Sequence, residues 1–174
     1  ILPKVKPFEH FQNYLHHGYY PFFLENRNFM EALLKAMNNM IEVDILFDKQ
    51  IELKYLSRIK KLLYLLAAAG EDFSPNVSRL EEIQTSRATV MNYLEYLEEA
   101  RLINMVYKEG DSFPKKPAAV MLHDTNLIYG IKAGEITEQT VMETFFVNVL
   151  WRHHTISKGR RPGFYTIDGT TEIC

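Results

Sequence analysis

Polar side chains suited to contacts with DNA cluster where a helix is predicted to begin. They are Ser86, Arg87, Thr89 and Asn92. A guanidinium and an amide can form hydrogen bonds with base edges in the major groove, and hydroxyl groups can contact bases or phosphates. These four residues therefore predict a surface that reads duplex DNA.

Basic side chains in two other stretches would contact the phosphate backbone. They are Lys54, Arg58 and Lys61, which share one side of a predicted helix, and Lys115 and Lys116, which are adjacent in a polar loop. Neutralisation of phosphates supplies most of the sequence-independent affinity for DNA. The charge of residues 79–101 argues against DNA binding, because this stretch holds three arginines and five glutamates. A protein-contact role for the same surface is therefore the alternative.

The spacing of apolar residues predicts the elements that hold these side chains. Val90, Leu94 and Leu97 recur at three- and four-residue steps after Ser86, a typical N-cap, which predicts a helix over residues 86–102. Before it come a predicted helix over residues 53–69, a second helix from residue 75 and a turn at residues 84–85; after it come strands over residues 103–107 and 119–123 around a polar tip at residues 108–117. This order predicts a winged helix-turn-helix domain over residues 51–123.

Residues 1–50 are predicted to form a separate helical segment. Apolar periodicity predicts helices over residues 8–16 and 28–43, and a dense aromatic connector over residues 19–23 joins them. Aromatic residues at this density usually pack between helices, so we interpret the connector as core.

Residues 124–174 are predicted to form the opening of an α/β unit. An amphipathic helix is expected over residues 137–151, followed by short strands over residues 164–167 and 171–173. The fold class expected for the whole chain is therefore mainly α with a small β component.

Composition limits the classes of protein to which the chain can belong. Hydrophobic residues make up 47% of the 174 residues and the net charge is −2, which indicates a globular domain without a global attraction to DNA or anionic membranes. A single cysteine, Cys174, excludes an internal disulfide framework and favours the cytoplasm. No apolar run approaches the roughly 20 residues of a membrane span, so we expect no membrane contact.

Other residues of metal-binding or anion-binding type occur in less suitable spacing. The histidine pairs are His16-His17 and His153-His154, and a basic loop covers residues 158–161. Adjacent helical histidines point about 100° apart, whereas a shared metal prefers a spacing of three or four residues. We therefore expect no metal site and interpret the basic loop as a solvated turn.

Four motifs in register carry a resemblance to a known family. They are Gly18-Tyr19-Tyr20-Pro21-Phe22-Phe23 with the preceding Tyr14-Leu15, residues 93–103, Asp124-Thr125-Asn126-Leu127 and Glu143-Thr144-Phe145-Phe146. In this order they resemble the C-terminal half of a bacterial and archaeal family of AAA-class ATPases. In that family a P-loop domain precedes a winged helix and a C-terminal domain of unknown function similar to PD-(D/E)XK nucleases. The resemblance covers essentially the whole chain.

The sequence departs from that family at both of its catalytic centres. No segment matches the glycine-rich phosphate loop G-x-x-x-x-G-K-[ST], so this chain alone is not expected to hydrolyse ATP. A metal-dependent nuclease needs carboxylates on adjacent strands. Glu143 matches the helix glutamate, but the strand aspartate aligns with Phe164 and the last glutamate aligns at or beyond Cys174. We therefore interpret Glu143 as the remnant of a degenerate nuclease-like site, with no catalytic residue in this chain.

The resemblance implies a division of labour within a longer protein. Residues 1–50 would be the end of the ATPase lid, residues 51–123 the winged helix and residues 124–174 a partial nuclease-like domain. Because the chain begins at Ile1 and ends within an expected strand, we interpret it as a fragment. The expected function is non-catalytic recognition or regulation, with ATP and Mg²⁺ bound only by the missing N-terminal ATPase domain.

Other expected partners are duplex DNA and further copies of the chain in a homo-oligomer. Two alternatives lie in other functional classes. A freestanding winged-helix transcription regulator would start close to Ile1. A nuclease would need carboxylates and a lysine just beyond Cys174.

Overall fold

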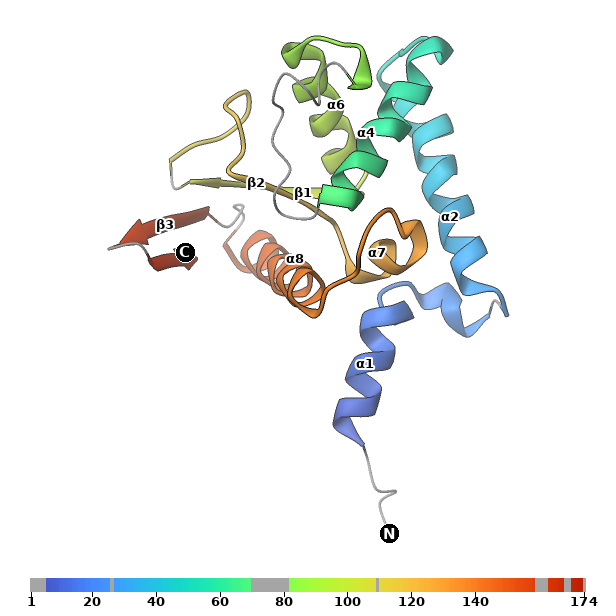
Figure 1. Cartoon of the computed structure of the whole chain (residues 1–174), viewed down its shortest axis with the longest axis vertical. Helices are drawn as coiled ribbons and strands as arrows, with labels where there is room; N and C mark the ends of the chain where they lie inside the picture. The colour runs from blue at the N-terminus through green and yellow to red at the C-terminus, as the bar shows by residue number, and fades with distance from the viewer. Residues whose placement is uncertain are drawn as a thin grey trace.

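The protein is mainly helical and carries one small sheet, as the sequence predicts. The computed structural model describes residues 6–25, 27–69, 82–108, 110–158, 163–167 and 170–173. The helices are α1 (Pro7–His17), η1 (Pro21–Leu24), α2 (Phe29–Asn39), η2 (Met40–Ile45), α3 (Leu46–Asp48), η3 (Leu53–Tyr55), α4 (Leu56–Ala69), α6 (Arg87–Glu99), α7 (Thr125–Ile131) and α8 (Glu138–Lys158). The strands are β1 (Ile103–Lys108), β2 (Ala119–Leu122), β3 (Gly163–Ile167) and β4 (Thr170–Ile173). Figure 1 shows α2 beside α4, with α7 and α8 below the sheet.

The helix predicted over residues 28–43 is longer in the structure than its apolar periodicity indicates. The Asn28 side chain caps α2 by accepting a hydrogen bond from the Glu31 amide at 3.5 Å. The helix then passes into a π-helical turn, η2, and a last turn, α3, so it ends at Asp48 rather than near Val43. Both Ile41 and Ile45 of η2 are buried, so the extra turns add to the core.

The central elements follow the predicted order of helix, turn, helix and ribbon. Ser86 caps α6, and Val90, Leu94 and Leu97 are fully buried against α4 and the sheet. β1 and β2 pair in antiparallel fashion, with Ile103 opposite Leu122. Of the helix predicted from residue 75, the structure describes only residues 82–83, which are helical; the remainder lies outside the described residues.

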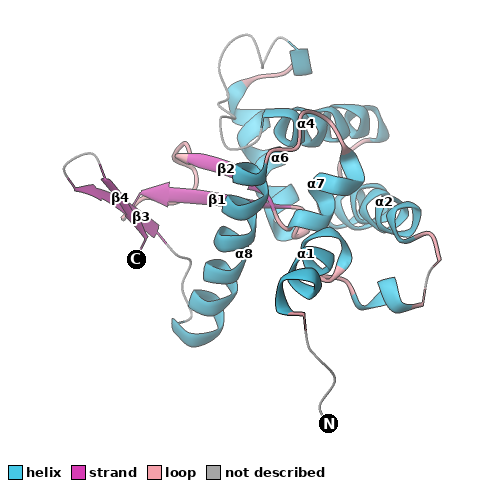
Figure 2. Cartoon of the chain, turned by 60° about the horizontal axis from the view of Figure 1, so that its bottom comes forward, coloured by secondary structure: helices cyan, strands magenta, loops and turns pink. Residues whose placement is uncertain are grey.

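The C-terminal strands join the same sheet as the ribbon. β3 pairs with β1 in parallel at residues 107–108, and β4 pairs with β3 in antiparallel fashion, giving the order β2-β1-β3-β4. Figure 2 shows both pairs of strands on one side of α8. The sequence predicts the two C-terminal strands but not their pairing with the ribbon.

One hydrophobic core joins all three predicted segments. It includes Leu15 and Leu33 from the first, Ile59 and Leu94 from the second, and Leu127 from the third. The segment boundaries near residues 50 and 123 stay predictions. In the described part of the chain, no helix combines the length and the apolar character that crossing a bilayer requires.

We expect Leu94→Ala to lower the free energy of unfolding by about 2–5 kcal/mol, because Leu94 is fully buried and its truncation leaves a cavity. Urea unfolding followed by circular dichroism measures this loss. Val149→Ala is the matched control, since Val149 is 43% exposed on α8. Equal losses in the two variants would contradict the packing described here.

Candidate functional site

Of the four predicted DNA-reading residues at the start of α6, two are engaged in capping the helix and two are exposed without such a role. The Ser86 hydroxyl accepts a hydrogen bond from the Thr89 amide at 3.2 Å, and the two hydroxyl oxygens lie 2.9 Å apart. Ser86 and Thr89 are therefore occupied in capping the helix. Arg87 and Asn92 are exposed, so base contacts would fall to these two side chains.

The basic residues of the helix predicted over residues 53–69, which would contact the phosphate backbone of DNA, lie in η3 and α4. The Lys54 ammonium lies 2.7 Å from the Glu52 carboxylate and 4.9 Å from the centre of the Tyr55 ring. The Arg58 guanidinium lies 5.3 Å from the centre of the same ring. Lys61 donates to the Glu82 carbonyl at 2.5 Å, which places its ammonium beside the turn that leads into α6.

The two lysines of the ribbon that are predicted to contact phosphates lie in its exposed tip. Lys115 forms an ion pair with Asp111 at 2.5 Å, and Lys116 is exposed. Lys115 would have to leave Asp111, or share its charge, to contact a phosphate. The two lysines come from the loop between β1 and β2, as the sequence predicts.

The acidic residues of α6 lie away from its first turns. Glu98 is buried, and its Oε1 accepts a hydrogen bond from the Met105 amide at 2.8 Å. Glu99 forms an ion pair with Lys49. Glu81 lies outside the described residues. Within α6 the acidic residues therefore lie in the second half of the helix, whereas the exposed Glu82 precedes the turn that leads into it.

Glu143 lies in the first half of α8 and is partly buried. Its Oε1 accepts a hydrogen bond from the Gln139 side chain at 2.8 Å, and its Oε2 is buried without a hydrogen-bond partner. Asp168 and the side chain of Glu172, the other carboxylates near the C-terminus, lie outside the described residues. The nuclease-like interpretation of Glu143 therefore stays a prediction.

The histidine pairs do not converge with other metal-binding side chains where the structure describes them. The His16 ring stacks on Tyr129, with ring centres 3.7 Å apart. Across the described residues, no group of three or more His, Cys, Asp or Glu side chains could hold a metal ion. The side chain of His154, residues 159–161 of the basic loop and Cys174 lie outside the described residues.

A buried polar cluster that the sequence analysis missed joins the aromatic connector to the end of the ribbon. We call it the polar latch, formed by Tyr19, Tyr20, His123, Asp124 and Asn126. The Tyr19 amide donates to Asn126 Oδ1 at 3.0 Å, and the Tyr20 hydroxyl donates to Asp124 Oδ2 at 2.8 Å. The latch therefore ties residues 19–20 to residues more than a hundred positions away.

The hydrogen bonds of His123 assign its neutral form. Asn104 Nδ2 donates to the His123 carbonyl, so Asn104 Oδ1 accepts from His123 Nδ1 at 2.9 Å. His123 Nε2 is then the acceptor for the Tyr19 hydroxyl at 3.1 Å. Burial, together with the charges of Arg101 and Arg152, lowers the pKa of His123 to about 4. Both observations describe a neutral imidazole at physiological pH.

Asp124 combines a helix cap with a buried carboxylate. Its Oδ1 accepts hydrogen bonds from the amides of Asn126 at 2.8 Å and Leu127 at 3.2 Å, which begins α7. Burial raises the pKa of Asp124 to about 6, whereas the hydrogen bonds from Tyr20 and the two amides act in the opposite direction. Burial and the neighbouring Asp124 also raise the pKa of Tyr20.

The latch groups bond chiefly to one another and to the backbone of α1. Asn126 Nδ2 donates to the Leu15 carbonyl at 2.9 Å, and the Thr125 hydroxyl donates to the same carbonyl at 2.5 Å. This arrangement suits a structural connection between α1 and α7. The sequence signals were present in Tyr19-Tyr20 and Asp124-Thr125-Asn126, but only the fold shows that they meet.

Comparisons with known proteins give one match. The sequence model of a family described as a domain of unknown function (DUF8612) matches residues 8–119, which is more than half of the chain. No curated protein and no solved structure matches the chain. The match runs from α1 to the first residue of β2 and carries no information about an ATPase.

Removing one hydroxyl tests the latch. We expect Tyr20→Phe to lower the free energy of unfolding by about 1–3 kcal/mol, because Asp124 Oδ2 loses the donor that satisfies it in a buried site. Chemical denaturation measures the change. Tyr64→Phe is the matched control, since Tyr64 is 52% exposed. If the hydrogen bond between Tyr20 and Asp124 does not stabilise the fold, both variants will show the same small change in the free energy of unfolding.

The two titrating latch residues should oppose each other between pH 4 and pH 6. The His123 pKa is lowered, so its contribution to stability is present above about pH 6.5 and is lost as the pH falls toward 4. The Asp124 pKa is raised, so its contribution is present below about pH 4 and is lost as the pH rises through 6. Each slope is about 1.4 kcal/mol per pH unit, and their sum is close to zero.

Single variants should expose each slope. Relative to the unmodified chain, Asp124→Asn should gain stability as the pH rises from about 4 to 6, and His123→Gln should lose stability over the same window. Urea midpoints measured at several pH values give the difference profiles. Flat difference profiles in both variants would show that neither group titrates as described.

Proposed function

The chain belongs to the DUF8612 family, a domain of unknown function, and we propose that it is a non-catalytic recognition region of a AAA-class ATP-binding protein. In this proposal α4, α6, β1 and β2 form a winged helix that contacts a partner. ATP and Mg²⁺ are bound by a P-loop domain that precedes this region. The resemblance of the four motifs supports the link to the ATPase class.

The observation that carries a recognition role is the exposed N-terminal half of α6. Arg87 and Asn92 reach solvent there, and the buried Glu98 and the paired Glu99 lie in the other half. The predicted phosphate contacts, Lys61 before the turn and Lys116 in the ribbon tip, come from neighbouring elements. These features favour duplex DNA as the partner.

The polar latch supports a regulatory role for the same region. It fixes α1 to α7 through buried hydrogen bonds, and α1 and α2 share the hydrophobic core with α4 and α6. Motion of a domain joined ahead of α1 would therefore reach the winged helix through packed elements. If a longer protein that includes the ATPase domain makes the same winged-helix contacts with and without ATP, this coupling is absent.

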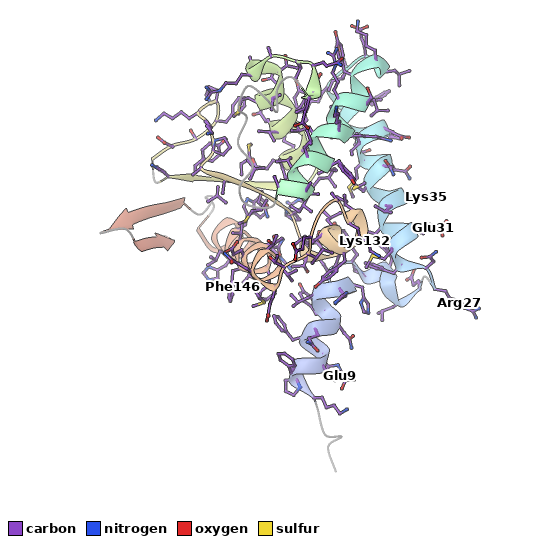
Figure 3. The ribbon with its side chains drawn as sticks, in the orientation of Figure 1. Glu9, Arg27, Glu31, Lys35, Lys132 and Phe146 are labelled. Carbon is purple, nitrogen blue, oxygen red and sulfur yellow. The ribbon has the colours of Figure 1, made fainter. Side chains whose placement is uncertain are left out.

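Duplex-DNA binding across a salt series tests the recognition role. We expect binding that weakens with salt, a loss of about 1–3 kcal/mol in binding free energy for Arg87→Ala, and a salt slope smaller by roughly 2 when Lys115 and Lys116 are both replaced by alanine. Fluorescence anisotropy of a labelled duplex measures all three. Lys35→Ala is the control, since Figure 3 shows Lys35 pointing outward from α2.

The outcomes separate two kinds of partner. An affinity that is salt-dependent but unchanged by the Arg87 and lysine variants would place DNA elsewhere on the protein. Absence of binding at low salt would leave the winged helix as a protein-contact module, and the search would move to the ATPase domain.

A freestanding DNA-binding regulator is the second candidate, because the same exposed half of α6 favours it. The parent gene separates the two. A glycine-rich phosphate loop upstream of Ile1 fits the ATPase proposal, and a start codon close to Ile1 fits the regulator.

A further inference from the structure

Two arginines from different elements flank a row of rings that pack edge to face. Arg101 follows α6, and its guanidinium lies 5.1 Å from the centre of the Trp151 ring. Arg152 is in α8, and its guanidinium lies 5.8 Å from the centre of the Tyr19 ring. His123 lies between, with its ring centre 5.8 Å from that of Trp151 and 5.7 Å from that of Tyr19. We call these five side chains the arginine–aromatic row.

The row has a positive charge at each end and a neutral centre. Arg101 and Arg152 are both exposed, and His123 is held neutral by its hydrogen bonds and its burial. Within the described ranges, no ion pair joins either arginine to a carboxylate. Both arginines lie close enough to His123 to lower its pKa. The surface therefore offers two cations to an anion from outside.

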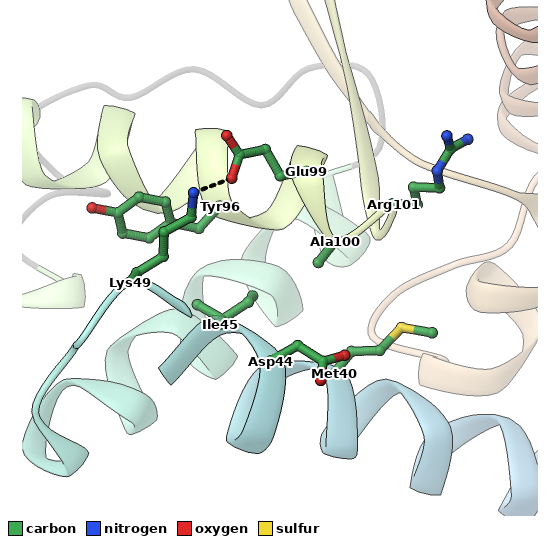
Figure 4. Close-up of a pocket in the computed structure, with 8 residues that line it drawn as sticks. All are labelled: Met40, Asp44, Ile45, Lys49, Tyr96, Glu99, Ala100 and Arg101. Atoms are coloured by element: carbon green, nitrogen blue, oxygen red, sulfur yellow. Dashed lines mark ion pairs between the residues drawn. The ribbon is translucent and has the colours of Figure 1, made fainter. Parts of the chain in front are cut away.

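Three carboxylates lie around the row, and none of the ion pairs among the described residues joins one of them to its arginines. Arg101 lies at the edge of a cavity of about 340 Å³ that is also lined by Asp44 and Glu99. Figure 4 shows the Arg101 guanidinium directed away from both, and Glu99 paired with Lys49. Asp124, under the row, is buried and accepts from Tyr20.

The backbone at Arg101 is one that arginine rarely adopts. Its φ is 56°, directly after Ala100, the C-cap of α6. Helices commonly end with glycine at this left-handed position, because a side chain there costs about 1 kcal/mol. The chain accepts that conformation at the residue whose side chain reaches Trp151. An observed backbone outlier of this kind is grounds for a functional hypothesis.

The chemistry of the row fits phosphate. A guanidinium that lies over a ring has less freedom to lose on binding, and its edge keeps paired N–H donors that match phosphate oxygens. The Trp151 indole nitrogen, at the Arg101 end of the row, is buried without a hydrogen-bond partner. Three rings separate the two guanidiniums, which suits two phosphates of one strand better than a single phosphate ion.

We infer that the arginine–aromatic row binds the phosphate backbone of a single nucleic-acid strand. The row lies at the opposite end of α6 from Arg87, and 13 helical residues span about 20 Å. It is therefore a second surface, and its use does not depend on DNA binding by the N-terminal half of α6.

The one tryptophan of the chain reports on this surface. Trp151 is the single tryptophan among 174 residues, so its emission reads the row without a label. Titration with a short oligothymidylate should change this emission with a dissociation constant on the order of 10⁻⁵ M at low salt. Replacing Arg87, Lys115 and Lys116 by alanine should leave the emission change intact, which separates this inference from the proposed function.

Two variants with a matched control decide the role of the arginines. Arg101→Gly and Arg152→Gln should each weaken oligothymidylate binding by roughly tenfold, measured by anisotropy of a labelled strand. The double variant should lower the salt slope by about 1.4, the value for two phosphates on a single strand. Arg27→Gln should bind as the unmodified chain does, since Figure 3 places Arg27 at the far end of α2.

The Arg101→Gly variant also separates binding from folding. Glycine suits the left-handed backbone at residue 101, so the melting temperature should be unchanged or higher while binding falls. Arg152→Lys should restore part of the affinity lost in Arg152→Gln, because it keeps the charge. Binding unaffected by both arginine variants would overturn the inference, and so would an equal loss in Arg27→Gln. An equal emission change with inorganic phosphate or with vesicles of anionic lipid would overturn the assignment to a nucleic-acid strand.

Discussion

The burial of one carboxylate constrains the rest of this fold. Asp124 is almost fully buried, yet it must satisfy both of its oxygens. It does so by beginning α7 with one oxygen and by accepting the Tyr20 hydroxyl with the other. An unsatisfied carboxylate in this position would cost several kcal/mol. The position of α7 and the path of the aromatic connector are therefore fixed together, which brings the first and last segments of the described chain into contact.

The same connection determines what the surface offers. The Tyr19 hydroxyl bonds to His123, and the Arg152 guanidinium lies over the Tyr19 ring. The His123 ring packs in turn against the ring of Trp151, which completes the row. Meanwhile the capping of α6 by Ser86 leaves Arg87 and Asn92 exposed at the other end of that helix. Internal hydrogen bonds thus place cations on two separate faces of a chain whose net charge is slightly negative.

Local sequence signals predicted the elements better than their assembly. The N-cap at Ser86, the buried stripe of Val90, Leu94 and Leu97, and the strands of the ribbon are confirmed, because caps and periodicity act over a few residues. The latch could not be predicted in this way, since Tyr19 and Tyr20 lie about a hundred positions from their partners and no spacing rule relates them. The inward position of Glu98 could not be predicted either, because a charge count over residues 79–101 does not show which side chains are buried.

The shared sheet has a mechanical consequence. Since β1 carries β2 on one side and β3 on the other, it is an interior strand and not the free arm of a hairpin. The parallel pairing with β3 lies at Tyr107 and Lys108, where the chain leaves β1 for the exposed tip. A shift of the C-terminal hairpin would therefore act on the root of that tip rather than on its end. The base of the tip is therefore held by β3, a strand that lies far from it in the sequence.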